Sequence, residues 1–222
     1  NDGNDWNSGL KYRFEARGLT MSLAANRAYG SEGVKPSDYA GSVGYDFRKI
    51  RGKVLLGDFN ARFGQGLVLW NGAFITSLST PSAFMKKPSG LSRSWSYTGG
   101  AALTGAAAEV GVKGFTFSAV LAIPGVKDAS LRPDELRLMP AANIAWQCRH
   151  GQVSVTHMAE LSGFRANDQV QTRIPVMKTS ADAAFCVRGV NIYGEAAYDW
   201  VERNVDVLAG TDFKAGEDVR LA

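Results

Sequence analysis

The chain has 222 residues, of which 45% are hydrophobic and 21% charged, and this composition excludes both a disordered chain and a helical membrane protein. The net charge of +4 is spread along the chain without a block of lysine or arginine, so nucleic-acid binding is not supported. Glycine is abundant (25 residues) and proline scarce (7), which favours strands and close turns over linkers.

A two-residue alternation starts near the beginning of the chain. From Leu10 onward, charged side chains alternate with apolar ones: Lys11, Arg13, Glu15 and Arg17 against Tyr12, Phe14 and Ala16. Successive side chains of a strand leave on opposite faces, so this segment is predicted to be a strand with one charged and one apolar face.

The same alternation predicts strands along most of the remaining chain. They are expected at Leu10–Arg17, Leu19–Ala28, Tyr39–Arg48, Val54–Gly64, Trp95–Gly111, Phe115–Ile123, Leu136–Arg149, Gln152–Leu161, Val176–Val187, Val190–Trp200, Val205–Lys214 and from Glu217 onward. Loops are expected at Asn1–Gly9, Tyr29–Asp38, Gly125–Glu135 and Ser162–Arg173. Short turns alternating with long loops are typical of an up-and-down barrel in an outer membrane.

The fold class that we predict is therefore all-β, an antiparallel up-and-down transmembrane β-barrel with about twelve strands. Residues 1–222 are interpreted as a single β-barrel domain that is incomplete at both ends, because the chain starts without Met and ends inside an alternating run. A soluble β-barrel or sandwich is the alternative, in which the apolar rows would fill a core instead of facing lipid.

One long stretch, Leu67–Ser96, breaks the alternation. No charge occurs between Gly64 and Met85, which raises the possibility of a spanning helix. Polar residues and Pro81 interrupt the apolar runs, which are too short to cross a bilayer as a helix. We expect instead a long loop that folds inward or carries a short helix, and it is the candidate for a segment that constricts the barrel.

The composition of the apolar rows favours lipid as their environment. The rows contain many Tyr, Phe, Trp, Ala, Val and Gly residues and few bulky aliphatic ones, whereas a close-packed soluble core needs volume. We expect four phenylalanines to face outward: Phe59, Phe63, Phe115 and Phe117. Aromatic residues near strand ends match an interfacial belt: Tyr12, Tyr39, Trp95, Tyr198 and Trp200.

The segment Gly57–Trp70, with the sequence GDFNARFGQGLVLW, resembles a stretch in the barrel region of Bacteroidota outer-membrane proteins that carry a helix-hairpin-helix segment before the barrel. Gly90–Ser94 and Gly99–Ala102 are similar to the family's next block, although Tyr97 and Thr98 stand where the family has an acidic residue before Arg-Gly. The resemblance implies a location in the bacterial outer membrane. It implies no reaction, and the helix-hairpin-helix segment is not in this sequence, so it implies no DNA binding.

The two cysteines are predicted to be free thiols. Cys148 shares a strand face with Ile144 and Trp146, whereas Cys186 shares one with Ser180 and Asp182. If both registers hold, the two thiols lie on opposite faces of the sheet and cannot form a disulfide.

The charged rows are the candidate functional residues. Nine of them are expected to line the lumen: Lys11, Arg13, Glu15, Arg17, Asp58, Asn60, Arg62, Glu195 and Asp199. Rings of charge set selectivity in pores, although the same residues could form an ion-pair network that fills a closed barrel.

No motif in the sequence indicates an enzyme. The two histidines lack metal-ligand spacing, and no nucleophile elbow or phosphate-binding loop occurs, so we predict no catalytic residue, metal or cofactor. The function that we expect is a porin-like channel or transport component whose partner is outer-membrane lipid. An outer-membrane barrel enzyme and a soluble ligand-binding barrel are the alternatives. The sequence does not identify a solute.

Overall fold

The computed structural model describes residues 7–27, 38–71, 85–94, 102–125, 135–166, 169–214 and 220–221. Thirteen β-strands form within these residues. They are β1 Ser8–Ala16, β2 Leu19–Arg27, β3 Asp38–Asp46, β4 Arg51–Arg62, β5 Gly90–Arg93, β6 Leu103–Val112, β7 Phe115–Ala122, β8 Glu135–Cys148, β9 Gly151–Ala166, β10 Gln169–Val187, β11 Val190–Asp199, β12 Asn204–Lys214 and β13 Arg220–Leu221. No helix that could span a membrane occurs in this part of the chain.

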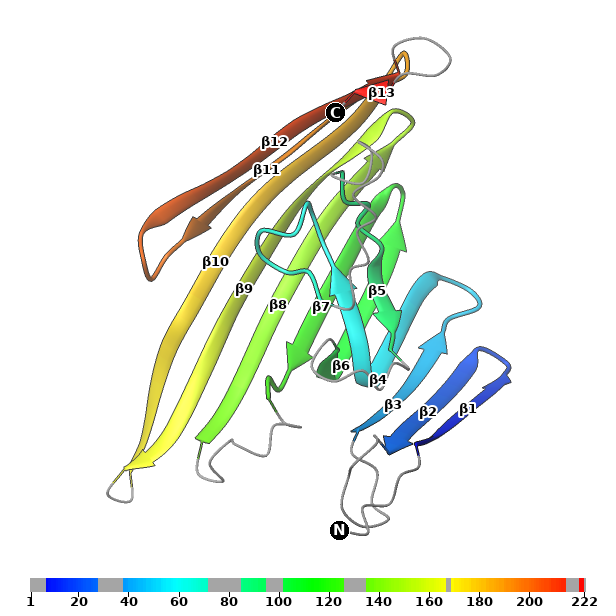
Figure 1. Ribbon diagram of the computed structural model, residues 1–222, viewed down its shortest axis with the longest axis vertical. Coiled ribbons are helices and arrows are strands. Elements are labelled where there is room, and N and C mark those ends of the chain that lie inside the picture. Colours follow the sequence, from blue (N-terminus) through cyan, green and yellow to red (C-terminus); the bar gives the residue numbers. More distant parts are fainter. Residues whose placement is uncertain are drawn as a thin grey trace.

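The strands form one antiparallel up-and-down sheet (Figure 1). Each strand pairs with its neighbours along the chain, except that β4 pairs with β6 and the short β5 pairs with β4 outside this path. Two-residue turns such as Arg17-Gly18 and Arg188-Gly189 join strands at one rim, and both residues of these turns have positive φ. Such turns match the twist of the strands that they connect.

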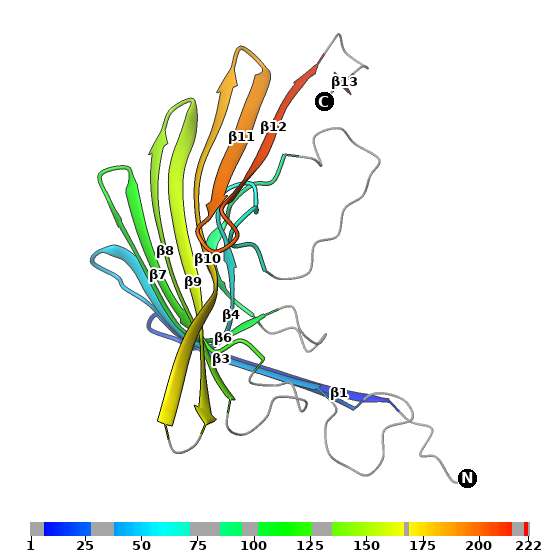
Figure 2. The same ribbon diagram turned by 90° about the vertical axis from the view of Figure 1, so that its left-hand side faces the viewer.

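The sheet is strongly curved and open (Figure 2). Strands β1 to β3 at one end and β12 at the other bend toward the same side, and the second half of β4 also lies on that side. We call this the concave face and its opposite the convex face. No pairing joins β1 to β12 or β13 in the described residues, so the all-β up-and-down prediction holds, the sheet is open, and a transmembrane barrel stays a prediction.

A belt of polar side chains crosses the concave face. Because paired residues lie directly opposite each other, the register places seven polar residues of neighbouring strands side by side: Asp46, Lys53, Glu109, Ser118, Asn143, Thr156 and Ser180. Ser118, Asn143, Thr156 and Ser180 are all buried. Small hydroxyl and amide groups therefore occupy positions that a soluble protein would fill with aliphatic side chains.

An apolar belt lies on the convex face, one residue away along each strand. Its registered members are Val110, Phe117, Ile144, Val155, Ala181, Ala196 and Val207. The larger ones are exposed, from 37% for Val110 to 71% for Val207. The alternation read from the sequence thus separates two faces, with the apolar one outward.

One predicted loop is wrong. Residues 162–166 belong to strand β9 and residues 169–173 to strand β10, and the ladder pairs Ser162 with Arg173 and Gln169 with Ala166. The polar composition that suggested a loop belongs instead to the far end of a long hairpin, where the strands extend past their neighbours (Figure 1). Side-chain polarity says little about strand formation where neither face has to be buried.

The face assigned to the second half of β4 is also wrong. Phe115 and Phe117 are exposed on the convex face as predicted, but Phe59 is 0% and Phe63 3% exposed. Beyond Gly57, where φ is +90°, β4 leaves the register of β3 and pairs with β5 on the concave side. Its phenylalanines then pack against the sheet instead of facing away from it.

Several predictions fall wholly or partly outside the described residues. These are the loops at Asn1–Gly9, Tyr29–Asp38 and Gly125–Glu135, the middle of Leu67–Ser96, the start of the strand Trp95–Gly111, the family-like block at Gly99–Ala102, and most of the run from Glu217. The cysteine prediction is confirmed, since Cys148 and Cys186 are both free and exposed. Ile144 and Trp146 beside Cys148 are exposed, whereas Ser180 and Asp182 before Cys186 are buried.

Candidate functional site

The candidate site is a segment that folds onto the concave face. It comprises residues 58–71 and 85–94, which we call the inner segment. Figure 2 shows the second half of β4 standing off the sheet on this side. The only apolar cluster of buried residues in the described chain lies between this segment and strands β4 and β6 to β8: Leu55, Phe59, Ala61, Phe63, Leu69, Leu91, Ala107, Val120, Ala122, Met139 and Ala141. The inner segment is thus packed on the sheet, not merely adjacent to it.

A carboxylate from the far end of the sheet holds the first turn of the inner segment. Glu195 on β11 is 3% exposed, and its Oε2 accepts hydrogen bonds from the backbone N–H groups of Gln65 at 2.7 Å and Leu67 at 3.0 Å. Hydrogen bonds to an ionised acceptor are among the stronger ones in proteins. Gly64 has φ +58°, and a Cβ there would lie 2.9 Å from the Glu195 carboxyl carbon. Glycine is therefore required for this approach.

A second carboxylate holds the return of the segment in the same way. Glu109 on β6 accepts a hydrogen bond from the backbone N–H of Leu91 at 3.1 Å through Oε2. Its Oε1 lies 3.1 Å from the Lys53 ammonium, which compensates its charge. The preceding residue, Gly90, has φ +66°, and a Cβ there would lie 2.5 Å from Glu109 Oε2. Each docking point thus combines a sheet carboxylate with a left-handed glycine.

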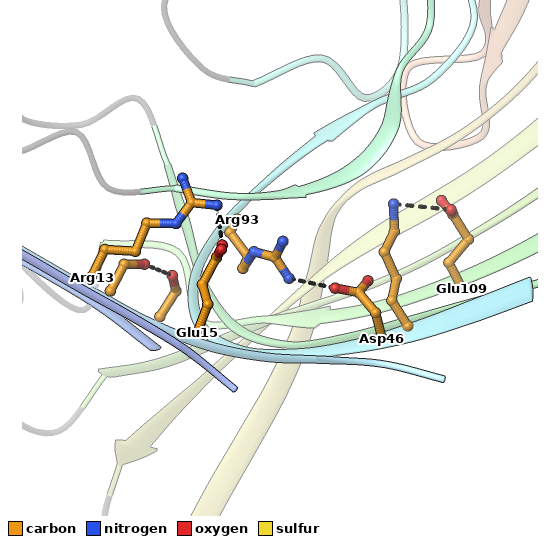
Figure 3. A network of polar contacts seen from close by, with 8 residues as sticks. Arg13, Glu15, Asp46, Arg93 and Glu109 are labelled. Carbon is orange, nitrogen blue, oxygen red and sulfur yellow. Dashed lines mark hydrogen bonds and ion pairs between the residues drawn. The ribbon is translucent and has the colours of Figure 1, made fainter. Parts of the chain in front are cut away.

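Arg93 makes a third contact between the inner segment and the sheet. Its guanidinium donates to Asp46 on β3 at 2.9 Å (Figure 3). A Cβ on Gly44 would lie 2.9 Å from Arg93 Cδ, so the small residue on β3 leaves room for the arginine stem. The Asp46, Lys53 and Glu109 part of the polar belt is therefore engaged in ion pairs with itself and with the inner segment.

The two parts of the inner segment also bind each other. The Gln65 side chain donates from Nε2 to the Lys86 carbonyl at 3.1 Å and accepts from the Lys86 N–H at 3.0 Å. The Trp70 ring contacts two cations, with the Arg62 guanidinium 5.9 Å and the Lys86 ammonium 5.2 Å from its centroid. The stretch Phe63–Trp70, which dominates the family-like motif, thus forms the core of the docked segment.

No protein-family model and no curated protein matches the chain. The resemblance of Gly57–Trp70 to Bacteroidota barrels therefore stays a prediction. The physical roles of Gly64, Gln65 and Trp70 within the inner segment do not depend on it.

The predicted lumen residues of β1 divide between the concave face and the rim. Lys11, Arg13 and Glu15 lie on the concave side, since Arg13 is paired with Ser22 and Glu15 with Thr20, both buried there. Arg13 forms an ion pair with Glu15, and both side chains are about half exposed (Figure 3). Arg17 is in the turn between β1 and β2 with φ +49°, so its placement on the same row is wrong.

The predicted lumen residues of β4 have local partners instead. Asp58 is buried, accepts a hydrogen bond from the Gly41 N–H at 2.7 Å and binds the Thr104 hydroxyl. It thereby bonds both neighbouring strands where β4 leaves the sheet.

Asn60 and Arg62 both bind Asn71. The Asn71 amide donates to Asn60 Oδ1 at 3.4 Å, and Arg62 Nε donates to the Asn71 carbonyl at 3.2 Å. These two residues therefore stabilise the inner segment, and their assignment to the lumen stays a prediction.

The predicted residues of β11 are placed on the concave face, as expected. Glu195 holds the inner segment. Asp199 is buried, lies 3.3 Å from the Lys178 ammonium and accepts N–H groups of Val201 and Glu202 at 2.9 and 3.0 Å. Asp199 therefore shapes the turn to β12. Whether any of these residues contacts a solute stays a prediction.

A polar cavity of about 110 Å³ lies beside the docked segment. Its lining includes Gly64 and Gly90 from the inner segment, and Glu109, Asn143, Gln152 and Ser154 from the sheet. Glu109, Asn143 and Ser154 were not singled out in the sequence, because single polar residues in alternating runs do not stand out. Because the alternation and the strand order place them on the same face of the sheet as Glu195, pairing the predicted strands in register could have identified them.

Proposed function

We propose that the chain is part of a bacterial outer-membrane β-barrel that acts as a channel or transport component. The convex face would contact lipid, and the concave face would line an aqueous interior that the inner segment narrows. The observation that carries this proposal is the inverted distribution of side chains, with polar belts buried and apolar belts exposed.

Hydrophobicity decides between lipid and water as the medium of the convex face. Burying a Val, Leu, Ile or Phe side chain contributes roughly 1.5–3 kcal/mol relative to leaving it in water. The apolar belt crosses seven registered strands, and several members are at least half exposed, including Ile144 and Val155 at 50%. Contiguous exposed rows of this length suit a membrane much better than a monomer in water.

Aromatic side chains occur toward both rims of the convex face, which supports the same orientation. Tyr45 and Phe47 pack edge to face at the short-turn rim, with their ring centroids 5.4 Å apart. Tyr198 and Trp200 pack edge to face at the opposite rim, with a centroid separation of 4.9 Å. Interfacial belts of Tyr and Trp mark both boundaries of a membrane-spanning β-sheet.

The alternative of a soluble ligand-binding barrel is less well supported. Such a barrel fills its interior with apolar side chains and exposes polar ones. Here the concave face carries buried Ser, Thr, Asn, Asp and Glu residues, and the apolar cluster is restricted to the contact with the inner segment.

The decisive experiment is reconstitution of the full-length protein in planar lipid bilayers, with measurement of conductance and ion selectivity. A channel should give discrete conductance steps, and the narrowing by the inner segment predicts a small step size. Recovery of the protein in the soluble fraction, with no heat-dependent shift in gel mobility, would contradict the proposal.

A further inference from the structure

Three buried polar atoms without a hydrogen-bond partner belong to residues on the concave face of β10 and β11. The described residues contain four buried side-chain atoms without a hydrogen-bond partner, and three of them are Ser180 Oγ, Asp182 Oδ2 and Glu195 Oε1. Asp182 is directly opposite Glu195 in the ladder, and Ser180 is two residues away on the same face of β10. The exposed fractions are 2% for Ser180, 4% for Asp182 and 3% for Glu195.

Two facing carboxylates in such a place require a compensating positive charge. Directly opposed residues have Cβ atoms about 4.5–5.5 Å apart, and like charges at that separation destabilise the pair. A buried unpaired charge costs several kcal/mol of free energy. Within the described chain, neither carboxylate forms an ion pair. The lysine on the same face of β10, Lys178, is 3.3 Å from Asp199 and 3.9 Å from Asp206.

The other carboxylate oxygens are already used. Glu195 Oε2 accepts the N–H groups of Gln65 and Leu67, and Asp182 Oδ1 binds the Ser154 hydroxyl. These bonds fix both side chains and leave one oxygen of each available. Hydrogen bonds that orient a ligating carboxylate are a regular feature of metal sites.

The polar cavity lies next to this pair. Ser154 and Gly64 both line it, and they are the immediate neighbours of Asp182 and Glu195 respectively, whereas the two carboxylates are not part of the lining. Water ligands for a cation held by two carboxylates and one hydroxyl would have to enter from this cavity.

We propose that Asp182 and Glu195, with the Ser180 hydroxyl, bind a hard divalent cation such as Ca²⁺. Carboxylate, hydroxyl and water oxygens are the ligands that Ca²⁺ and Mg²⁺ prefer, and the absence of nitrogen or sulfur ligands disfavours zinc. Ligand spacing along the chain does not reveal such a site, because strand pairing brings Asp182 and Glu195 together. The cation would also stabilise the inner segment, because Glu195 would bind it through Oε1 while Oε2 accepts the N–H groups of Gln65 and Leu67.

The test is Ca²⁺ titration of the full-length protein in detergent micelles, with bound metal measured by equilibrium dialysis and stability by thermal unfolding. The wild type should bind one Ca²⁺ per chain, and chelation with EDTA should lower its unfolding temperature. Asp182→Asn should abolish binding, and Ser154→Ala should weaken it by roughly 10–100-fold. Asp212→Asn is the matched control, because Asp212 is buried on the same face and already accepts a bond from Asn191 at 3.2 Å.

Absence of Ca²⁺, Mg²⁺ and Mn²⁺ binding by the wild type would overturn the proposal. The proposal would also be overturned if Asp182→Asn raised the unfolding temperature above that of the wild type by the same amount with and without Ca²⁺. That result would indicate that the two carboxylates share a proton in the wild type. If Asp182→Asn does not fold, the Ser154→Ala and Ser180→Ala variants replace it in the test. An unchanged Ca²⁺ affinity in both of these variants would overturn the proposal. The inference does not depend on a channel, so metal binding without conductance would reject only the proposed function.

Discussion

At the scale of single residues, the docking of the inner segment depends on Glu195 and Gly64. Glu195 accepts two backbone N–H groups that come from about 130 residues earlier in the chain. Gly64 gives both the left-handed backbone and the space for that carboxylate. Glu195 and Gly64 are therefore both required for the docking, and a separate substitution tests each of them.

Gly64→Ala should destabilise the docked segment. The left-handed conformation costs a residue with a Cβ roughly 1–2 kcal/mol, and the added methyl would also displace the Glu195 carboxylate. We expect faster hydrogen exchange at the amides of Gln65 and Leu67, measured by mass spectrometry. Gly189→Ala is the control, because a Cβ there meets nothing within 4 Å although φ is also positive. Unchanged exchange in Gly64→Ala would contradict the proposed docking.

Glu195→Ala should open the interior more than Glu195→Gln does. The alanine leaves two buried N–H groups without an acceptor, at about 1–3 kcal/mol each, whereas the glutamine carbonyl can still accept from them. In planar bilayers, single-channel conductance should rise more in the alanine variant than in the glutamine variant. Equal conductance in all three proteins would mean that the segment does not narrow the pore.

At the scale of elements, β4 belongs to two layers. Its first half pairs with β3 and β6 in the sheet, and its second half pairs with β5 above the concave face. The positive φ of Gly57 and the buried carboxylate of Asp58 mark the position of the change. The neighbouring strands β7 and β8 pair with each other without a register shift and keep an apolar row on the convex face. They are therefore the proper place to test contact with lipid.

Ile144→Arg should block membrane assembly. Ile144 is 50% exposed in the apolar belt, and arginine near the bilayer midplane costs about 2–4 kcal/mol on the lipid face of a barrel. The measurement is heat-modifiable gel mobility of the membrane fraction. Gln147→Arg on the same strand is the matched control, because Gln147 lines the polar cavity on the concave face. Normal assembly of Ile144→Arg would argue against a lipid-facing convex surface.

At the scale of the whole molecule, the curved sheet brings four two-residue turns to one rim, whereas β9 meets β10, and β11 meets β12, at the opposite rim. The turns at Arg17-Gly18, Lys113-Gly114, Arg149-His150 and Arg188-Gly189 all lie at the same rim. If the sheet crosses a membrane, this rim lies on one side of it. The two cysteines are natural reporters, since both lie beside these turns.

Both thiols should therefore react from the same side of the membrane. Cys148 and Cys186 are exposed and close together, since the Cys186 N–H donates to the His150 carbonyl at 2.7 Å. A membrane-impermeant maleimide should label Cys148→Ser and Cys186→Ser equally in intact cells, either both or neither. Permeabilised cells give the control for total reactivity. Labelling of only one single-thiol variant in intact cells, with both labelled after permeabilisation, would contradict the arrangement.

The sequence by itself determined the strands and their two faces wherever a regular alternation runs, as in β2, β7, β8 and β11. The reason is local, because a period of two fixes which side chains share a face. For the same reason, the alternation correctly placed Cys148 and Cys186 on opposite faces of the sheet. Strand boundaries were not determined in this way, because residues 162–166 and 169–173 are paired strands despite their polar composition.

Only the tertiary structure decided what each face contacts. Phe59 and Phe63 follow the predicted alternation, yet they are buried because β4 leaves the sheet and packs on its concave side. The contact of Glu195 with Gln65 and its pairing with Asp182 join residues whose proximity depends on how the strands are ordered and curved. The alternation along a strand determines which face a side chain is on, whereas the order and curvature of the strands determine which residues it contacts.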